Sequence, residues 1–190
     1  MYEENPVLHA LCTRRSIRQY DSSRSVETEK IQAILTAGQY APTGRNRMAT
    51  KFVVVQEKSL RDKLSKWNAE IMGAEIDPFY GAPVVILVLA DSSVHTWVED
   101  GSLAIGAMLD AAYAEGLGSC WIHRAREIFD SPEGKKLLQE WNIPADYRGI
   151  GFCAVGYAKG EYPKAASRKE DQILWISYLF IHTKKTPPAT

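Results

Sequence analysis

The sequence predicts one globular domain that mixes helices and strands without the regular strand–helix alternation of a doubly wound fold. Three observations predict it. The 190 residues are 45% hydrophobic and 24% charged, which is ordinary for a soluble domain. The expected order is helix, helix, strand, helix, strand, long helix, strand, helix, strand. No G-x-G-x-x-G follows the first strand, which disfavours a Rossmann or P-loop fold.

The N-terminal segment predicts a short helix followed by a cluster of arginines. Asn5 suits an N-cap and Pro6 the first helical position, so we expect a helix from Pro6 to about Thr13. The stretch Arg14–Tyr20 then holds three arginines and a serine. Guanidinium groups stay charged and match phosphate, so this stretch is a candidate anion site. The alternative is a solvated basic face at the end of a helix.

The next segments predict a helix, a polar loop and a strand. Ser25 opens the expected helix, with acidic residues in its first turn, and Pro42 ends it. The segment Ala41–Arg47 is a tight polar loop with a flexible glycine. Lys51–Gln56 has the composition of a buried strand.

The middle of the chain supplies the predicted core. An amphipathic helix is expected from Ser59 to about Gly73. The segment Ala82–Ala90 has almost no polar alternation, which predicts a central strand covered on both faces. The helix expected over Trp97–Gly116 is apolar or small nearly all round, so we place it in a subunit interface.

The C-terminal third predicts two strands, a helix and a tail. A short strand, Ser119–Ile122, is followed by His123 and Arg124, at the kind of strand end where α/β folds bind ligands. A helix is expected over Ser131–Trp141 and a last core strand over Gly149–Tyr157. Residues 1–190 are expected to form one domain, with 170–190 as a C-terminal tail, apolar over Ile173–Ile181, that packs on a partner subunit.

The composition also disfavours several classes of protein. The 23 Lys and Arg residues balance 23 Asp and Glu residues, so no general attraction to nucleic acid or anionic membranes is expected. No apolar run has the length of a membrane span, and the N-terminus does not resemble a secretory signal. Three cysteines without a C-x-x-C pair and four histidines without ligand spacing predict no metal site and a cytoplasmic location.

Five segments in this order resemble the nitroreductase family of flavoproteins, over roughly Asn5 to Ile176. They are Arg14-Arg15-Ser16-Ile17-Arg18-Gln19-Tyr20-Asp21, Ala41-Pro42-Thr43-Gly44-Arg45-Asn46, Ala82-Pro83-Val84-Val85-Ile86, Gly116-Leu117-Gly118-Ser119-Cys120-Trp121-Ile122 and the basic tail around Arg168. The resemblance implies an α+β fold, a three-layer α/β/α sandwich around a mostly antiparallel sheet. It also implies an intertwined homodimer that binds FMN at the interface.

The resemblance further implies roles for individual residues. Arg14 would anchor the FMN phosphate, with Arg15 and Ser16 on phosphate and ribityl oxygens. Arg18 would lie against the N1/O2 edge of the ring, where a cation stabilises the charge that develops on reduction. The remaining candidates are the partner-subunit loop Pro42, Thr43, Gly44 and Asn46; Asn68 facing the ring; the Ile122, His123 and Arg124 segment, where a backbone N–H addresses flavin N5; and Arg168, helped by Lys164 or Lys169, over the phosphate.

The implied function is an FMN-dependent oxidoreductase that transfers hydride from NAD(P)H to nitroaromatic or quinone-type acceptors. No side-chain nucleophile is needed, and Cys120 is expected to be buried and inert. His123 is either a proton donor or substrate contact, or a packed or surface histidine. Alternatives are a flavin-binding sensor or storage protein without turnover, and a same-fold reductase of another acceptor, such as a dehalogenase or enoate reductase.

Two segments depart from the family pattern. Arg47-Met48-Ala49-Thr50 stands where many members have Gln-Pro-Trp, and His123-Arg124 stands where many have Gly-Gly. Bulkier residues at the second position change access to the flavin face, so the acceptor cannot be carried over from the family.

Overall fold

A four-stranded antiparallel sheet forms the middle layer of the computed structural model, which describes residues 4–176. The strand order is β1-β2-β4-β3. The strands are β1 (Thr50–Val55), β2 (Val84–Asp91), β3 (Gly118–Ile122) and β4 (Tyr147–Gly156). The register shifts between Val88 and Leu89, where β2 pairs with β4. The two longest strands therefore lie at the centre, and the two shorter ones at the edges.

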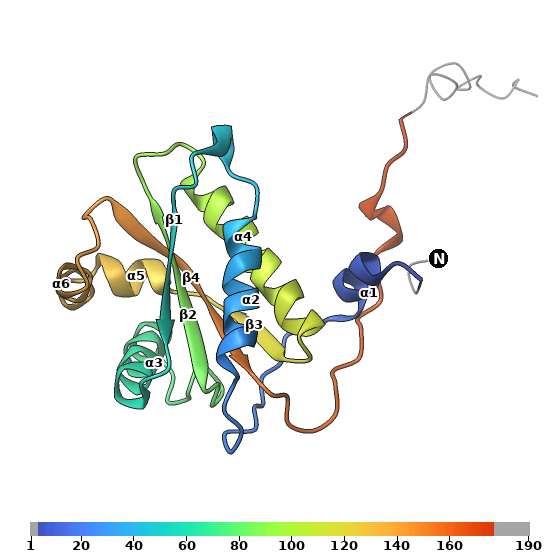
Figure 1. Ribbon diagram of the computed structural model, residues 1–190, viewed down its shortest axis with the longest axis horizontal. Coiled ribbons are helices and arrows are strands. Elements are labelled where there is room, and N and C mark those ends of the chain that lie inside the picture. The colour runs from blue at the N-terminus through green and yellow to red at the C-terminus, as the bar shows by residue number, and fades with distance from the viewer. Residues whose placement is uncertain (1–3, 177–190) are drawn as a thin grey trace, which may run out of the picture.

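Helices cover both faces of this sheet, as Figure 1 shows. One face carries α2 (Thr28–Gln39) and the long α4 (Trp97–Ala114). The other carries α3 (Lys58–Met72), α5 (Ala125–Asp130) and α6 (Pro132–Glu140). The first helix, α1 (Pro6–Thr13), lies apart from these layers beside the end of α4. The expected three-layer α/β/α arrangement is confirmed.

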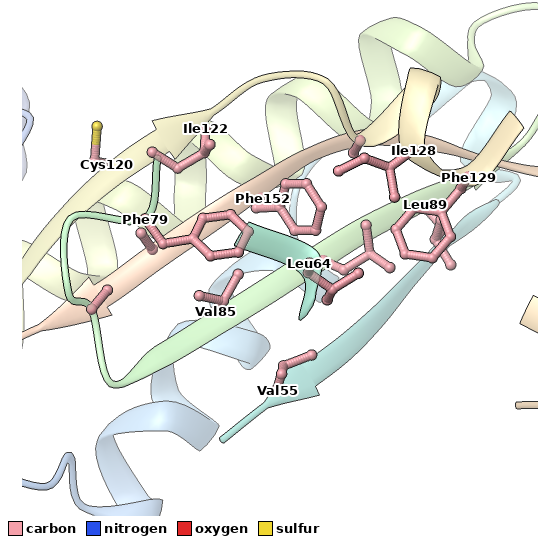
Figure 2. Packing of buried hydrophobic residues seen from close by; sticks show 14 of the residues in the cluster. Val55, Leu64, Phe79, Val85, Leu89, Cys120, Ile122, Ile128, Phe129 and Phe152 are labelled. Atoms are coloured by element: carbon pink, nitrogen blue, oxygen red, sulfur yellow. The ribbon is translucent and has the colours of Figure 1, made fainter. Parts of the chain in front are cut away.

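The sheet divides the core into two apolar clusters. Phe79, Phe129 and Phe152 pack on the face covered by α3 and α5, with the rings of Phe79 and Phe152 5.1 Å apart (Figure 2). Ile34, Ile105 and Met108 fill the space under α2 and α4. Residues 84–90 of β2 are all buried. The prediction of a central strand covered on both faces is therefore confirmed.

Local sequence signals explain where several helices begin and end. The Asn5 side chain accepts hydrogen bonds from the N–H groups of Val7 and Leu8, at 3.0 and 3.1 Å, and so caps α1. Ser131 caps α6 in the same way, by accepting from Gly134 N–H. Gly73 ends α3 with φ 68°, a left-handed conformation that glycine adopts without steric cost.

Three expectations about elements were wrong. The second helix begins at Thr28 rather than Ser25, because Glu27 is still extended and serves as its N-cap. β1 is an edge strand in which only Val55 is buried, although its composition predicted a buried strand. The six-residue α5 was not expected at all, because no side chain caps its N-terminus to mark it in the sequence.

Two helices present apolar surface to solvent in the single chain. α4 was expected to be buried all round, but Leu103 on its outer face is 50% exposed. α1 has no buried residue, and its Val7, Leu8 and Leu11 are all exposed. The apolar tail shows the same exposure over Ile173–Ile176, and its continuation lies outside the described residues. The subunit interface stays a prediction.

Candidate functional site

The arginine segment is held against the start of β3 by backbone contacts. Ile17 N–H donates to the carbonyl of Ser119 at 2.9 Å, and Ser16 and Ser119 form a parallel bridge. Ile17 and Tyr20 are buried, while the side chain of Arg18 is exposed between them. The apolar residues of the segment therefore fix its position, and Arg18 remains available to a ligand.

Arg14 is oriented by an ion pair with the long helix α4. Its Nε donates to Asp110 Oδ1 at 2.9 Å, and the two side chains are 29% and 27% exposed. Within residues 4–176 the two terminal amino groups of this guanidinium make no hydrogen bond with protein. Arg14 therefore presents two donors in an orientation set by Asp110, which suits an anion.

Arg15 turns back on the end of α1 instead of pointing outward. Its Nη1 donates to the carbonyls of Cys12 and Arg14, at 2.8 and 2.6 Å. Those carbonyls belong to the last turn of a helix, where a basic side chain is favourable. The Nε of Arg15 is buried and has no partner in the part of the chain that the structure describes. Arg15 thus holds the helix end in this structure, and its expected role at a phosphate stays a prediction.

Cys120 on β3 marks the point around which the arginine segment gathers. Burial raises the pKa of its thiol, and Arg18, Ser16 and Arg14 partly oppose that rise. Figure 2 places Cys120 at the margin of the apolar cluster, and it lies in the middle of β3. The thiol is thus neutral at pH 7, consistent with an inert cysteine rather than a nucleophile.

The opposite end of β3 holds a second group of polar atoms. Asn68, on α3, is fully buried, and its Nδ2 donates to the carbonyl of His123 at 2.7 Å. Its Oδ1 is buried and has no hydrogen-bond partner among residues 4–176. A buried acceptor that lacks a donor costs about 1–3 kcal/mol, so this oxygen fits a donor supplied by a ligand.

The length of β3 therefore sets the distance between the arginine segment and the polar group at Asn68 and His123. Ser119 lies beside the arginine segment, and His123 follows four residues later. At about 3.3 Å per residue, the two ends are about 13 Å apart. Ile122, between them, turns its buried side chain into the core and offers only its backbone. The site is elongated, with cationic groups at one end and amide and backbone groups at the other.

A small pocket lies along the arginine segment. It has a volume of about 300 Å³, and its walls include Arg18, Gln19 and Lys159. Lys159 lies beside the arginine segment because its backbone N–H donates to the carbonyl of Gln19 at 3.0 Å. Sequence reasoning missed Lys159. Its position directly after the last core strand was the available signal.

The loop Pro42–Asn46 lies at the other end of α4 from Arg14. Gly44 N–H donates to Asp100 Oδ1 at 2.9 Å, and a Cβ at Gly44 would lie 2.1 Å from Thr96 Oγ1. Asp100 and Asp110 are ten residues apart on one helix, which is about 15 Å. The structure therefore does not bring Pro42, Thr43, Gly44 and Asn46 to the arginine segment of the same chain.

This loop also contains strained backbone. Arg45, Asn46 and Met48 have φ between 49° and 54°, in the left-handed region that side chains rarely adopt. The loop borders a hollow of about 850 Å³ that also touches α2 and β1. Strain of this kind persists only where the surrounding structure imposes it.

The basic tail is not gathered at the site in the single chain. Arg168, Lys164 and Lys169 are all exposed in a segment without regular structure, apart from the short helix η2 (Glu170–Gln172). No hydrogen bond or ion pair joins Arg168 to the arginine segment within residues 4–176. Among the described residues there is also no metal-binding group of three ligands, and no helix has the length and hydropathy to span a membrane.

Comparison with known proteins adds a family match. Residues 11–157 match the sequence profile described as Nitroreductase family. A Methanothermobacter thermautotrophicus protein, provisionally named NADH dehydrogenase/NAD(P)H nitroreductase, is 34% identical over 155 residues, which cover 80% of this chain and 76% of the relative. A protein of the same provisional name from Archaeoglobus fulgidus is 32% identical over 160 residues, covering 81% of this chain and 86% of the relative.

Solved structures agree in fold. A nitroreductase with bound FMN from Bacteroides fragilis superposes with a TM-score of 0.83 at 26% identity, covering 91% of this chain and all of that one. An FMN-dependent nitroreductase from Clostridium difficile superposes with a TM-score of 0.81 at 25% identity, with the same coverage.

A further relative by sequence is an iodotyrosine deiodinase from Thermotoga neapolitana. It is 24% identical over 171 residues, covering 80% of this chain and 88% of the relative.

Proposed function

Because the chain belongs to the nitroreductase family, we propose that it transfers hydride from NAD(P)H, through FMN, to flat electron-poor acceptors such as nitroaromatics or quinones. Family membership confirms the expected oxidoreductase class. The FMN-bound structural relative and the NAD(P)H in the relatives' names confirm the expected cofactors. The acceptor is the part of this proposal that the family does not supply.

The observation that carries the proposal is the elongated site along β3. An FMN molecule has a dianionic phosphate at one end and a ring with N–H and carbonyl groups at the other. Arg14 matches the first end in charge, and the Oδ1 of Asn68, which has no partner among residues 4–176, matches a ring donor. The donor set of this chain therefore fits the cofactor along the length of the strand.

Bound FMN would supply the redox chemistry, by accepting hydride at N5 and passing it on. The residues of the chain would bind and orient it. Arg14, held by Asp110, would contact the phosphate, with Ser16 beside it. Arg18 would place a fixed cation at the ring edge where negative charge develops, so that the charge is stabilised without reorganisation. Asn68 would fix the ring plane through its Oδ1.

We also propose that the working form is a homodimer, with residues 1–190 as one domain in each subunit. The loop Pro42–Asn46 is anchored about 15 Å from the Arg14 end of its own chain, so it would complete the site of the partner subunit. The exposed apolar surfaces of α1, α4 and Ile173–Ile176 would be covered in that assembly. Arg168, which has no hydrogen bond or ion pair with the arginine segment among the described residues, would then reach a phosphate. Three free thiols fit a cytoplasmic location.

A second candidate is a reductase of the same fold that acts on another acceptor. The deiodinase relative supports this alternative, since it has a different substrate in its name and aligns over 80% of this chain. Both candidates predict FMN that is reduced by NAD(P)H, and they differ in which acceptor reoxidises it. A sensor or storage protein predicts bound FMN that NAD(P)H does not reduce.

The test begins with the visible spectrum of the purified protein, followed by anaerobic mixing with NADH or NADPH. The proposal expects flavin absorption that bleaches within seconds and returns on addition of a nitroaromatic or quinone. Bound FMN that stays oxidised for minutes would refute turnover. Rapid bleaching without reoxidation by either acceptor would favour the second candidate.

The phosphate assignment is tested by Arg14→Ala. This variant should be folded by circular dichroism and purify without flavin colour. Arg24→Ala is the matched control, because Arg24 stacks on the Tyr157 ring at 3.3 Å and has no proposed ligand role. Arg14→Ala protein with the FMN content of the wild type would overturn the assignment. Sedimentation tests the assembly, and a stable monomer that retains FMN would contradict the homodimer.

A further inference from the structure

Arg124 adopts a backbone conformation that normally favours glycine. It follows the end of β3 with φ 74° and ψ 13°, in the left-handed region. A glycine would hold this conformation without strain, whereas an arginine is strained. An arginine at such a position points to a use for its side chain that offsets the strain.

The guanidinium of Arg124 has no partner within the described residues. Its neighbours are engaged: Arg126 stacks over the Trp97 ring at 4.6 Å, and Arg148 pairs with Asp130. Glu127, one helical turn away, forms no ion pair with Arg124 in residues 4–176. Arg124 is only partly buried, so its charge remains available to a molecule that arrives from solvent.

The position of Arg124 ties this free cation to the ring end of the proposed FMN site. The preceding residue, His123, accepts the hydrogen bond from Asn68 through its carbonyl at 2.7 Å. The same Asn68 carries the buried unpaired oxygen that fits a ring donor. The start of the α5 helix that follows packs closely against β4, because a Cβ at Gly149 would lie 2.3 Å from the Ala125 carbonyl. Arg124 is therefore held at a fixed place beside the ring end.

We propose that Arg124 recognises a carboxylate on the acceptor, so that the enzyme prefers flat acceptors that carry an anionic group. This inference rests on the proposed function and names the substrate class of the same site. A guanidinium binds a carboxylate through two parallel N–H···O bonds, which position the acceptor as well as attract it. The net charge of the whole chain is zero, so the preference would come from this local cation rather than from the general surface.

The test compares two acceptors of nearly equal shape, 4-nitrobenzoate and 4-nitrobenzamide, which differ in charge. For each protein, kcat/KM for the benzoate is divided by kcat/KM for the benzamide, so that changes common to both acceptors cancel. Arg124→Gln should lower this ratio by about tenfold relative to wild type, as expected for loss of one charge-assisted pair. Arg124→Lys, which keeps the charge, should retain part of the ratio.

Two further variants separate recognition from folding. Arg124→Gly removes the side chain and also the backbone strain, so it should be at least as stable as wild type and should still lose the preference. Arg126→Gln removes a charge two residues away that already stacks on Trp97, and should leave the ratio unchanged. Binding of benzoate can be measured directly from the shift that it causes in the flavin spectrum. This binding should weaken in Arg124→Gly and not in Arg126→Gln.

The outcomes distinguish this inference from the proposed function. Variants that bind FMN, are reduced by NADPH at the wild-type rate and keep the benzoate-to-benzamide ratio overturn the role of Arg124 alone. A wild-type protein that binds no FMN, or whose FMN is not reduced, overturns the proposed function and this inference with it. An equal fall in both kcat/KM values would also refute the inference, since it shows a role without charge selectivity.

Discussion

Asp110→Asn provides a quantitative test of how the phosphate end of the site is organised. The change removes the charge that faces Arg14 but keeps the size of the side chain and an acceptor oxygen. The pair is formed at 2.9 Å by side chains that are each less than a third exposed. Such partly shielded pairs lie near the upper end of the range for surface ion pairs, about 1 kcal/mol.

The effect on FMN affinity follows from that figure. If Asp110 acts only by orienting Arg14, its loss costs at most the energy of the pair, which is about a fivefold rise in Kd. Arg14→Ala removes the charge-assisted bonds themselves, worth about 1.5–3 kcal/mol, and should raise Kd by about tenfold to a hundredfold. In the Arg14→Ala background, Asp110→Asn should add nothing, because the group that it orients is absent.

The assay is the quenching of free FMN fluorescence on binding, at fixed ionic strength, for the wild type, the two single variants and the double variant. Asp62→Asn serves as control, since Asp62 pairs with Lys58 and Arg61 on the surface of α3, and its Kd should be unchanged. Equal losses from Asp110→Asn with and without Arg14 would refute the orienting role. In that case Asp110 would act on FMN independently of Arg14.

Three further changes test other parts of the structure. Gly44→Ala should lower the free energy of unfolding by about 1–3 kcal/mol, because the added Cβ would meet Thr96 Oγ1. In urea titrations, adding Thr96→Ala to this variant should restore part of the lost stability. For Asp77, burial opposes ionisation, but hydrogen bonds from two side chains and two backbone N–H groups lower its pKa overall. The stability that ionised Asp77 contributes is therefore fully present above about pH 4 and is lost as the pH falls. The fall in stability with acid should be less steep in Asp77→Asn than in the wild type. Parallel curves of stability against pH for the two proteins would count against this prediction. Burial raises the pKa of Cys153 to about 12, with a further rise from Cys120. The unfolded thiol ionises near pH 8.5, whereas the folded one keeps its proton up to about pH 12, so rising pH favours the unfolded chain. Stability should therefore fall between about pH 9 and 12 by up to about 1.4 kcal/mol per pH unit. This slope should be shallower in Cys153→Ala.

The elements that the sequence predicted well are those in which one physical signal dominates. The strand Val84–Asp91 is apolar without interruption, and only a strand buried on both faces satisfies that composition. α1 and α6 begin at a capping side chain followed by proline, so the start of α1 was placed to the residue and that of α6 within one residue. The antiparallel pairing and the three layers followed from the resemblance to a family rather than from periodicity.

The errors arose where tertiary context decides. β1 has the same β-branched composition as a central strand, yet it lies at an edge, because strand order depends on contacts between distant segments. α5 has six residues and starts from the strained Arg124, so neither its length nor its cap was visible in the sequence. The missed Lys159 reaches the site only because its backbone pairs with Gln19.

The candidate site was predicted in parts that one chain does not assemble. The sequence placed Arg14, Ser16 and Arg18 in one stretch, and the structure gathers them around Cys120. It did not indicate that the Asn68 side-chain oxygen lacks a partner among residues 4–176, since that depends on what surrounds the amide after folding. The roles of the site residues stay predictions, to be tested by the variants described above.

The length of α4 has a consequence for how the chain can evolve. Asp100 holds the loop at Gly44 and Asp110 holds Arg14, so the helix sets both the distance and the angle between two functional segments. One inserted residue between them would rotate Asp110 by about 100° and shift it by about 1.5 Å relative to Asp100. Residues between the two aspartates can change in identity more readily than the interval between them can change in length. Insertions and deletions compatible with activity should therefore fall in the connecting loops, and the count of residues across this interval should change less than their identity.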